Sequence, residues 1–586
     1  MVRLAISTWI VCALLGLSAC ATQTAPAGPT TGLALTFAAL TSAQCSASAN
    51  GSGNVPKDVE RLTVQWTADN AAAPGSTLSG RATIARESVD GTNTWNVLAL
   101  PVTKKMNIEV YGCDKTGKVI YGGRTNDLAV EDQKETTARV FMTPMGKLAC
   151  TGSGGSATMT APRSLSGGAV LPRGDVVIVG GLGAWSSKKV IGTATGAVDI
   201  YDYRLGQFRK GPNLQAPRIA PHVHAISETQ VLVVGGLTQI DYISTLAAQP
   251  SPLLAPDAYN DTTVPKLKAE VIDVSDNSVK ASAAEVVVGA LPQSSSIHRN
   301  NDILFVGGVD TSGAPVAAAT RVGGLQDIAG GGKGTKVDVT LSAARARPAL
   351  LAFADDSVVV WGGSKNATDM GEIIGPDGTK GTPLVVSGDT IIGHPGFTAV
   401  GSIAVVIGGS GDTLSFLVGG GALYSTAFAD NTPSYVVTVD KVQLTAVCKP
   451  IALSQGTLRV GFGAAAVKLP TGQVAIAGGV LALKALPDIC KNETECILDS
   501  FVILEMPTDL NAATVTFAVA SSGKLGADAK GPHFGMLALP LPSGSLFVGG
   551  QTGILTGEDN DKVLDDVGEI VNLPPNADNQ AVICAP

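Results

Sequence analysis

Residues 169–181 read AVLPRGDVVIVGG: a short apolar run, a tight polar turn, and a second apolar run that ends in two glycines. The same pattern returns in AISETQVLVVGG (225–236), LLAFADDSVVVWGG (350–363) and AVKLPTGQVAIAGG (466–479). Short runs rich in β-branched residues and bounded by turn residues are typical of strands. The pattern therefore predicts a repeated pair of antiparallel strands that ends in a glycine pair.

Seven such glycine pairs occur along the chain, at a mean spacing of about 61 residues. Their second glycines are Gly181, Gly236, Gly308, Gly363, Gly409, Gly479 and Gly550. The fifth pair is ambiguous, because FLVGG at Gly419–Gly420 makes the spacings on either side 57 and 59 in place of 46 and 70. Either choice gives seven units, and a fixed long period indicates a repeat architecture.

Two further features recur in the units. Arg163, Arg218 and Arg345 each lie 17 residues before the first glycine of a pair. Another short strand, often led by an acid, follows the pair: VDIYD (198–202), EVIDV (270–274), EIIGP (372–376), YVVTV (435–439), FVILE (501–505) and EIVNL (569–573). Helical periodicity is nowhere sustained, so the region is predicted to be all-β with four strands per unit.

The repeat resembles the kelch repeat, in which two hydrophobic strands end in Gly-Gly and an acid-led strand follows. The match covers roughly residues 150–586, and the third unit departs from it, with ATRVGG (319–324) in place of the acid-led strand. The resemblance implies a β-propeller over residues 149–586, in which each unit is one four-stranded blade. Seven copies imply seven blades, with six or eight as the alternatives.

Residues 33–148 lack the glycine period. RLTVQWT (61–67), KMNIEVYGCD (105–114) and TTARVFM (136–142) alternate apolar and polar side chains. Short alternating strands with turn residues between them predict a β-sandwich. The stretch resembles the immunoglobulin-like or fibronectin-like modules that precede propellers in bacterial surface proteins.

The N-terminus reads MVRLAISTWIVCALLGLSAC, with one positive charge and an apolar stretch too short to span a bilayer comfortably. Its end, Leu17-Ser18-Ala19-Cys20, resembles the lipobox of bacterial lipoproteins. The resemblance implies a signal peptide over 1–19, lipid on Cys20 and, because Ala21 is not Asp, an outer-membrane address. Residues 20–32 are then a flexible tether. An ordinary secretory signal with an incidental cysteine is the alternative.

Composition excludes two classes of protein. Charged residues make up 15% of the chain and hydrophobic ones 45%, with 70 glycines and a net charge of −8. The apolar content is too high for a charge-rich disordered protein. A nucleic-acid partner is not expected, because a phosphate backbone requires a basic face.

Seven cysteines follow Cys20. In an oxidising compartment they are disulfide candidates, and an odd number leaves at least one unpaired within the monomer. The predicted pairs are Cys45–Cys113, Cys150–Cys584 and Cys490–Cys496. The alternatives are that Cys150 or Cys584 pairs with Cys448, or stays free.

Two metal sites are conceivable. His222 and His224 alternate in PHVHA, so a strand would place both on one face as a two-histidine half-site near the propeller axis. Histidines hydrogen-bonded within the sheet are the alternative. The acids Asp559, Asp561, Asp565 and Asp566 of GEDNDKVLDD could bind Ca²⁺, although a solvated acidic loop describes them as well. No other cofactor is predicted.

The kelch family includes galactose oxidase and its relatives, which hold copper through two tyrosines and two histidines. Tyr201 and Tyr203 are the only tyrosine pair near a suitable blade position, and no cysteine lies beside a matching tyrosine, so no catalytic residue is carried over. A non-enzymatic binding or scaffold protein is expected, recognising a protein or glycan through the loops at 237–268, at 480–498 and after Gly550. The alternatives are a metal-dependent, copper oxidase-like enzyme with its site in the propeller channel, and a purely structural envelope component.

Overall fold

The fold was obtained as a computed structural model. It describes residues 32–39, 55–56, 58–69, 75–85, 95–98, 100–132, 134–151, 158–185, 191–241, 269–281, 294–310, 314–364, 366, 368–388, 402–420, 434–461, 463–480, 498–525, 535–550, 568–571 and 583. This part of the chain is all-β, as predicted, apart from one short helix, α2 (Leu325–Ala329). None of its helices is long and apolar enough to cross a membrane.

The N-terminal unit is one hydrogen-bonded path of seven strands in the order β3-β2-β5-β6-β7-β1-β4. The strands are β1 (Gly32–Ala39), β2 (Arg61–Asp69), β3 (Thr77–Ala85), β4 (Trp95–Leu98), β5 (Thr103–Cys113), β6 (Val119–Val130) and β7 (Glu135–Pro144). Three of them confirm the strands predicted at 61–67, 105–114 and 136–142. Side chains alternate between the two faces of each strand, so the apolar ones gather on one face. They form a buried cluster that joins β2 and β5 to β7 and includes Leu62, Val64, Ile108, Val110 and Val140.

From Leu148 onward, most strands belong to seven small sheets. In each sheet we call the two strands before a glycine pair the first and second strands, and we number the sheets I to VII by the chain order of these first strands. Sheet I holds β9 (Gly167–Val170), β10 (Val176–Val179), β13 (Val198–Asp202) and β14 (Gln207–Lys210). Sheet II holds β15 (His222–Ala225), β16 (Gln230–Val234), β18 (Glu270–Asp273) and β19 (Ser278–Ala281). Sheet III holds β20 (Ser295–His298), β21 (Asp302–Val306), β22 (Val316–Gly323) and β23 (Thr335–Arg345).

Sheet IV holds β24 (Ala349–Ala352), β25 (Val358–Trp361), β26 (Gly371–Ile374) and β27 (Thr382–Pro383). Sheet V holds β29 (Ile403–Ser410), β30 (Thr413–Gly419), β31 (Tyr435–Asp440) and β32 (Thr445–Leu453), with β28 (Val385–Gly388) and β36 (Val515–Phe517) parallel to β32. Sheet VI holds β33 (Ala465–Lys468), β34 (Val474–Ala477), β35 (Ser500–Leu504) and β37 (Val519–Lys524). Sheet VII holds β38 (Leu537–Leu541), β39 (Gly544–Val548), β40 (Gly568–Val571) and β8 (Leu148–Cys150). A separate three-stranded sheet joins β11 (Leu182–Trp185), β12 (Ile191–Ala194) and β17 (Gln239–Asp241).

The glycine pairs lie where the sequence pattern places them, at the ends of the second strands. In sheet V the second strand is β30, which ends at Gly419. Gly408 and Gly409 instead lie inside β29, beside a register shift against β30. FLVGG is therefore the fifth repeat end, and AVVIGG is not.

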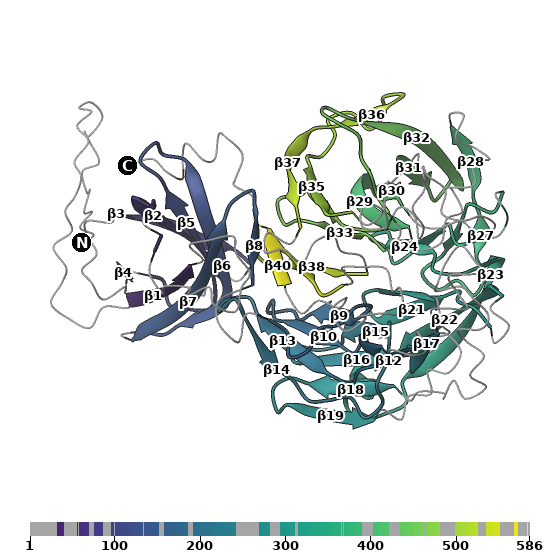
Figure 1. The fold of residues 1–586 in the computed structure, drawn as a ribbon, viewed down its shortest axis with the longest axis horizontal. Helices are drawn as coiled ribbons and strands as arrows, with labels where there is room; N and C mark the ends of the chain where they lie inside the picture. The colour runs from purple at the N-terminus through teal and green to yellow at the C-terminus, as the bar shows by residue number, and fades with distance from the viewer. Residues whose placement is uncertain are drawn as a thin grey trace, which may run out of the picture.

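The seven sheets follow one another in a circuit of contacts. The first strands touch in the order β9, β15, β20, β24, β29, β33 and β38, and β38 touches β9 again. Figure 1 shows these sheets grouped around a common centre, with the N-terminal unit to one side. Sheet VII spans the greatest distance in sequence, because its outer strand β8 comes from the start of the region and pairs Cys150 with Glu569.

A buried arginine links neighbouring sheets at three joints of this circuit. Gly181 N–H donates to the carbonyl of Arg218 over 2.7 Å, which joins sheet I to sheet II. Gly308 N–H donates over 2.8 Å to the carbonyl of Arg345, which ends β23 of sheet III and precedes β24 of sheet IV, and Gly550 N–H donates to Arg163 over 3.0 Å. The third of these bonds joins sheet VII to sheet I. The joint that closes the circuit is therefore built like two of the joints within it.

Each of these arginines also forms an ion pair with an acid in the third strand of the sheet that follows the arginine in the chain. The pairs are Arg163–Asp199, Arg218–Glu270 and Arg345–Glu372, and all six side chains are at most 2% exposed. The recurrence of Arg and acid in the sequence thus has a structural cause. A charge buried in this way needs its partner, because desolvation of a lone ion is costly.

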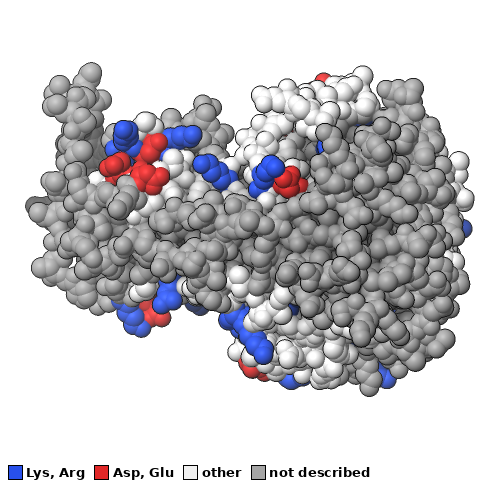
Figure 2. Space-filling model, viewed as in Figure 1, with Lys and Arg blue, Asp and Glu red and all other residues white. Residues whose placement is uncertain are grey.

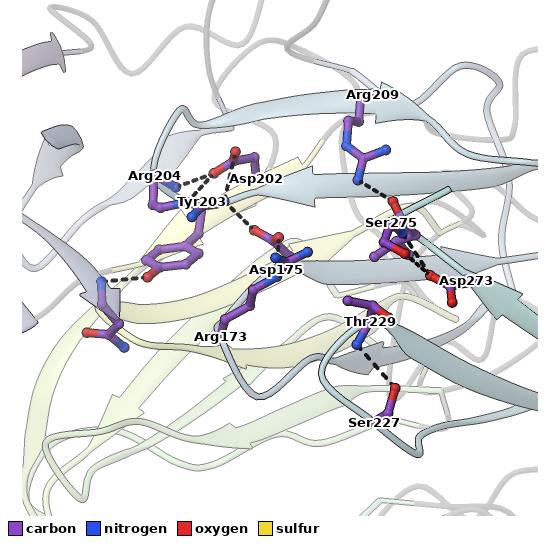
Figure 3. A network of polar contacts seen from close by, with 12 residues as sticks. Arg173, Asp175, Asp202, Tyr203, Arg204, Arg209, Ser227, Thr229, Asp273 and Ser275 are labelled. Carbon is purple, nitrogen blue, oxygen red and sulfur yellow. Dashed lines mark hydrogen bonds and ion pairs between the residues drawn. The ribbon is translucent and has the colours of Figure 1, made fainter. Parts of the chain in front are cut away.

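The N-terminal unit packs against the circuit on the side of the short turns between first and second strands. Figure 3 shows polar contacts on this side of sheets I and II. Asn126 N–H donates to the Tyr203 hydroxyl over 2.9 Å, and Arg204 pairs with Asp202 over 3.0 Å and Asp175 over 3.3 Å. Phe141 of β7 packs in one buried cluster with side chains of sheets I and VII. We call this the short-turn side, and the opposite edge the glycine-pair side.

Candidate functional site

Three of the five histidines lie together on the first strands of sheets II and III. His222 and His224 belong to β15, and His298 to the neighbouring β20. Because side chains alternate along a strand, His222 and His224 share a face, as the sequence predicts. Their rings are partly buried and point toward sheet III, where two serines meet them.

Ser296 bridges the two predicted histidines. Its hydroxyl oxygen lies 2.8 Å from His222 Nδ1 and 2.8 Å from His224 Nε2. The other nitrogen of His222, Nε2, lies 2.8 Å from the Ser294 hydroxyl. The His224 ring lies 6.0 Å from the ring of His298, centroid to centroid. The cluster is thus a hydrogen-bonded bridge between two sheets.

Burial keeps these imidazoles neutral. Desolvation, with a smaller contribution from the positive charge of Arg347, lowers the pKa of His222 to about 4. Desolvation also lowers the pKa of His224 to about 3, and His222 and His298 add to that effect. A neutral imidazole both donates and accepts, so the cluster offers polar but uncharged groups at neutral pH.

The described residues contain no group of three or more His, Cys, Asp or Glu side chains placed to hold a metal ion. The hydroxyls of Ser294 and Ser296 already engage three of the four ring nitrogens of His222 and His224. The observed arrangement is close to the hydrogen-bonded alternative, although the partners lie in the next sheet. A metal at His222 and His224 stays a prediction from the sequence.

Several predicted positions lie outside the described residues. They are the lipidated Cys20, the calcium candidates Asp559, Asp561, Asp565 and Asp566, the cysteines Cys45, Cys490, Cys496 and Cys584, and most of the three long loops. Their roles stay predictions.

The described cysteines divide into two kinds. Cys113 and Cys150 are disulfide-bonded. Cys448 is free and fully buried in the core between sheets IV and V, where desolvation raises the pKa of its thiol to about 12. The alternative in which Cys448 pairs with Cys150 or Cys584 is therefore wrong, because its side chain is enclosed by apolar neighbours.

A groove lined by polar side chains and Trp66, which no sequence motif predicted, lies on the N-terminal unit. It has a volume of about 410 Å³ and is lined by Gln65, Trp66, Thr67, Ser79, Gly80, Arg81, Asn107 and Glu109. Strand register aligns Gln65 with Arg81 on one side and with Glu109 on the other. Glu109 also accepts hydrogen bonds from Tyr111 over 2.9 Å and Arg124 over 3.0 Å. The only hint of this groove in the sequence is the alternation of polar residues in 61–67 and 105–114, which places several of the lining residues on one face of the sheet.

The charges of this unit are mixed. Figure 2 shows described Lys and Arg side chains beside Asp and Glu side chains on its visible face. Arg124–Glu109 and Lys105–Asp127 are ion pairs of this unit. A polar, nearly neutral partner suits such a surface better than a polyanion.

The low pKa values of His222 and His224 predict a stability that depends on pH. An unfolded histidine titrates near pH 6.5, so the unfolded chain takes up protons first as the pH falls. These histidines therefore do not lower the free energy of unfolding above pH 6.5. As the pH falls from 6.5 toward 4, each histidine lowers it by up to about 1.4 kcal/mol per pH unit. We expect the urea midpoint to fall over this range, and less steeply in the His222→Asn/His224→Asn double variant. Equal slopes in the two proteins would contradict the assignment.

No protein-family model matches the chain, and a comparison with curated proteins finds no significant relative.

Proposed function

We propose that the protein is a lipid-anchored binding or scaffold protein of the bacterial outer membrane, and that it has no catalytic role. In this proposal the seven sheets are the blades of a kelch-type propeller, and the N-terminal unit is an immunoglobulin-like sandwich that carries the lipid anchor at Cys20. The observation that supports it best is the circuit of first strands, with β8 as the outer strand of sheet VII. A ring of this kind has few free sheet edges and holds its connections rigidly.

The two sides of the circuit differ in a way that favours one of them for binding. The contacts with the N-terminal unit through Asn126 and Phe141 lie on the short-turn side. The connections from second to third strands leave from the glycine-pair side, and the longest of them follow Gly236, Gly479 and Gly550. The partner, a protein or a glycan, is proposed to bind on the glycine-pair side, away from the unit that carries the anchor.

The histidine cluster lies at the same side of sheets II and III. His222 pairs with Val234, the residue before the glycine pair of sheet II. Its neutral imidazole and the hydroxyls of Ser294 and Ser296 lie between the first strands of sheets II and III, at this end of β15. Uncharged donors and acceptors of this kind suit sugar hydroxyls or peptide amides.

Replacing residues 242–268 with a short Gly-Ser linker tests the proposed surface. We expect the retention of envelope proteins, or of glycans on an array, to fall at least about tenfold, the equivalent of 1.4 kcal/mol. A control variant alters the exposed turn Asp114–Lys118 of the N-terminal unit and should bind like the unaltered protein. Unchanged binding by the loop variant would count against this surface, and a stoichiometric metal in the purified protein would favour an enzyme instead.

A further inference from the structure

Ile583, near the end of the sequence, packs against the N-terminal unit. The carbonyl oxygen of Ile583 accepts a hydrogen bond from Thr63 Oγ1 over 2.7 Å and from Arg81 Nη2 over 2.6 Å. Ile583 is only 4% exposed and belongs to a small buried cluster with Cys113 and Val119. Ile583 therefore lies at one end of the polar sheet face formed by β2, β3 and β5.

Cys113, at the end of β5, is the centre of this contact. It is 1% exposed and disulfide-bonded, whereas the only other described cysteines are the bonded Cys150 and the free Cys448. The next residue after Ile583 is Cys584. Consecutive Cα atoms are about 3.8 Å apart, and a disulfide needs Cα atoms about 4.4–6.8 Å apart. Cys584 is therefore one Cα–Cα step from a residue in the buried cluster of Cys113, which makes it the partner that the described contacts favour.

The other candidate partners have described neighbours elsewhere in the molecule. The strand that precedes Cys45 ends at Ala39, which pairs with Met142 of β7. The segment that holds Cys490 and Cys496 begins and ends in sheet VI, where Leu498 N–H donates to Gly479. None of these described neighbours belongs to the buried cluster of Cys113, Val119 and Ile583.

We propose that Cys113 and Cys584 form a disulfide that fastens the C-terminus to the N-terminal unit. Two thiols lose two protons and two electrons to form the S–S bond. A disulfide of an oxidant protein in the exporting compartment accepts them and becomes two thiols. This pairing excludes both Cys45–Cys113 and Cys150–Cys584, and it leaves Cys45, Cys490 and Cys496 as partners for Cys150.

The bond has a structural consequence for the circuit of sheets. Two strands of sheet VII lie close in sequence to the proposed bond. β40 ends twelve residues before Ile583, and β8 follows the N-terminal unit directly. A bond from Cys584 to Cys113 ties the segment after β40 to the N-terminal unit, from which β8 follows directly. The pairing of β40 with β8 is thereby protected against fraying.

Peptide mapping of the mature protein without reduction tests the proposal. We expect one linked peptide pair to contain Cys113 and Cys584, and to separate on reduction with dithiothreitol. A linked pair that joins Cys113 to Cys45, Cys490 or Cys496 would overturn it.

Thiol labelling of variants gives an independent measurement. In Cys584→Ser, alkylation after denaturation without reductant should label Cys113 as well as Cys448. In the matched control Cys490→Ser, Cys113 should stay unlabelled. Labelling of Cys113 in the control but not in Cys584→Ser would contradict the assignment, and the map of the unaltered protein decides the case if Cys584→Ser fails to fold.

Discussion

Replacing Arg345 with methionine is expected to lower the free energy of unfolding by about 3–5 kcal/mol, because it leaves a buried carboxylate without its partner. Arg345 Nε donates to Glu372 Oε1 over 2.7 Å, and Nη1 donates to the carbonyls of Gly362 and Asp369 over 2.7 and 2.9 Å. Both charged side chains are at most 1% exposed. Methionine fills similar space but satisfies none of these acceptors.

A double variant distinguishes the cost of an unpaired buried charge from the cost of altered packing. Arg345→Met/Glu372→Gln removes the stranded charge and should recover part of the loss in urea unfolding, since replacing both buried partners is far less costly than replacing one. Lys134→Met is the control, because its partner Glu131 and Lys134 itself are exposed, and its urea midpoint should not change. A single variant as stable as the control would show that the Arg345 pair does not support the joint between sheets III and IV.

Gly549→Ala is expected to destabilise the protein more than a glycine replacement at an open turn. Gly549 has a φ of +66°, and a Cβ there would lie 2.5 Å from the Arg163 carbonyl oxygen. The backbone conformation costs an L-residue about 1–2 kcal/mol. Displacing the carbonyl that accepts the Gly550 N–H adds an overpacking cost of about 1–3 kcal/mol.

Gly456→Ala isolates the first of these costs. Gly456 has a similar φ of +72°, and nothing lies within 4 Å of the position its Cβ would take. The difference in urea unfolding between Gly549→Ala and Gly456→Ala therefore measures the crowding at the closing joint. Equal losses of unfolding free energy in the two variants would mean that Gly549 is not packed closely against the Arg163 carbonyl.

Much of the strand pattern could be predicted from the sequence. The short segments predicted after the glycine pairs at 198–202, 435–439 and 501–505 are third strands of their sheets, because each follows a strand that ends in a glycine pair. Local alternation and turn residues are sufficient to predict such elements. The fifth repeat shows where this reasoning ends: Gly408–Gly409 and Gly419–Gly420 look alike in sequence, and only the pairing of β29 with β30 distinguishes them.

The contacts that join distant segments left no such signal. β8 is three residues long, and its partner β40 lies more than 400 residues later. Ser294 and Ser296 contact His222 from 72 and 74 residues away, with no spacing motif to mark them. The disulfide partner of Cys113 also depends on tertiary contacts, and Ile583 supplies the evidence that sequence separation could not.

Closure of the circuit between sheets VII and I is the central claim, and amide hydrogen exchange at three glycines tests it most directly. The N–H groups of Gly181, Gly308 and Gly550 donate to the carbonyls of Arg218, Arg345 and Arg163, and only the last bond requires the two ends of the region to meet. A closed circuit predicts comparable protection at all three amides, measured residue by residue in the unaltered protein. Exchange of the Gly550 amide at the rate of an unstructured chain, with Gly181 and Gly308 still protected, would contradict closure.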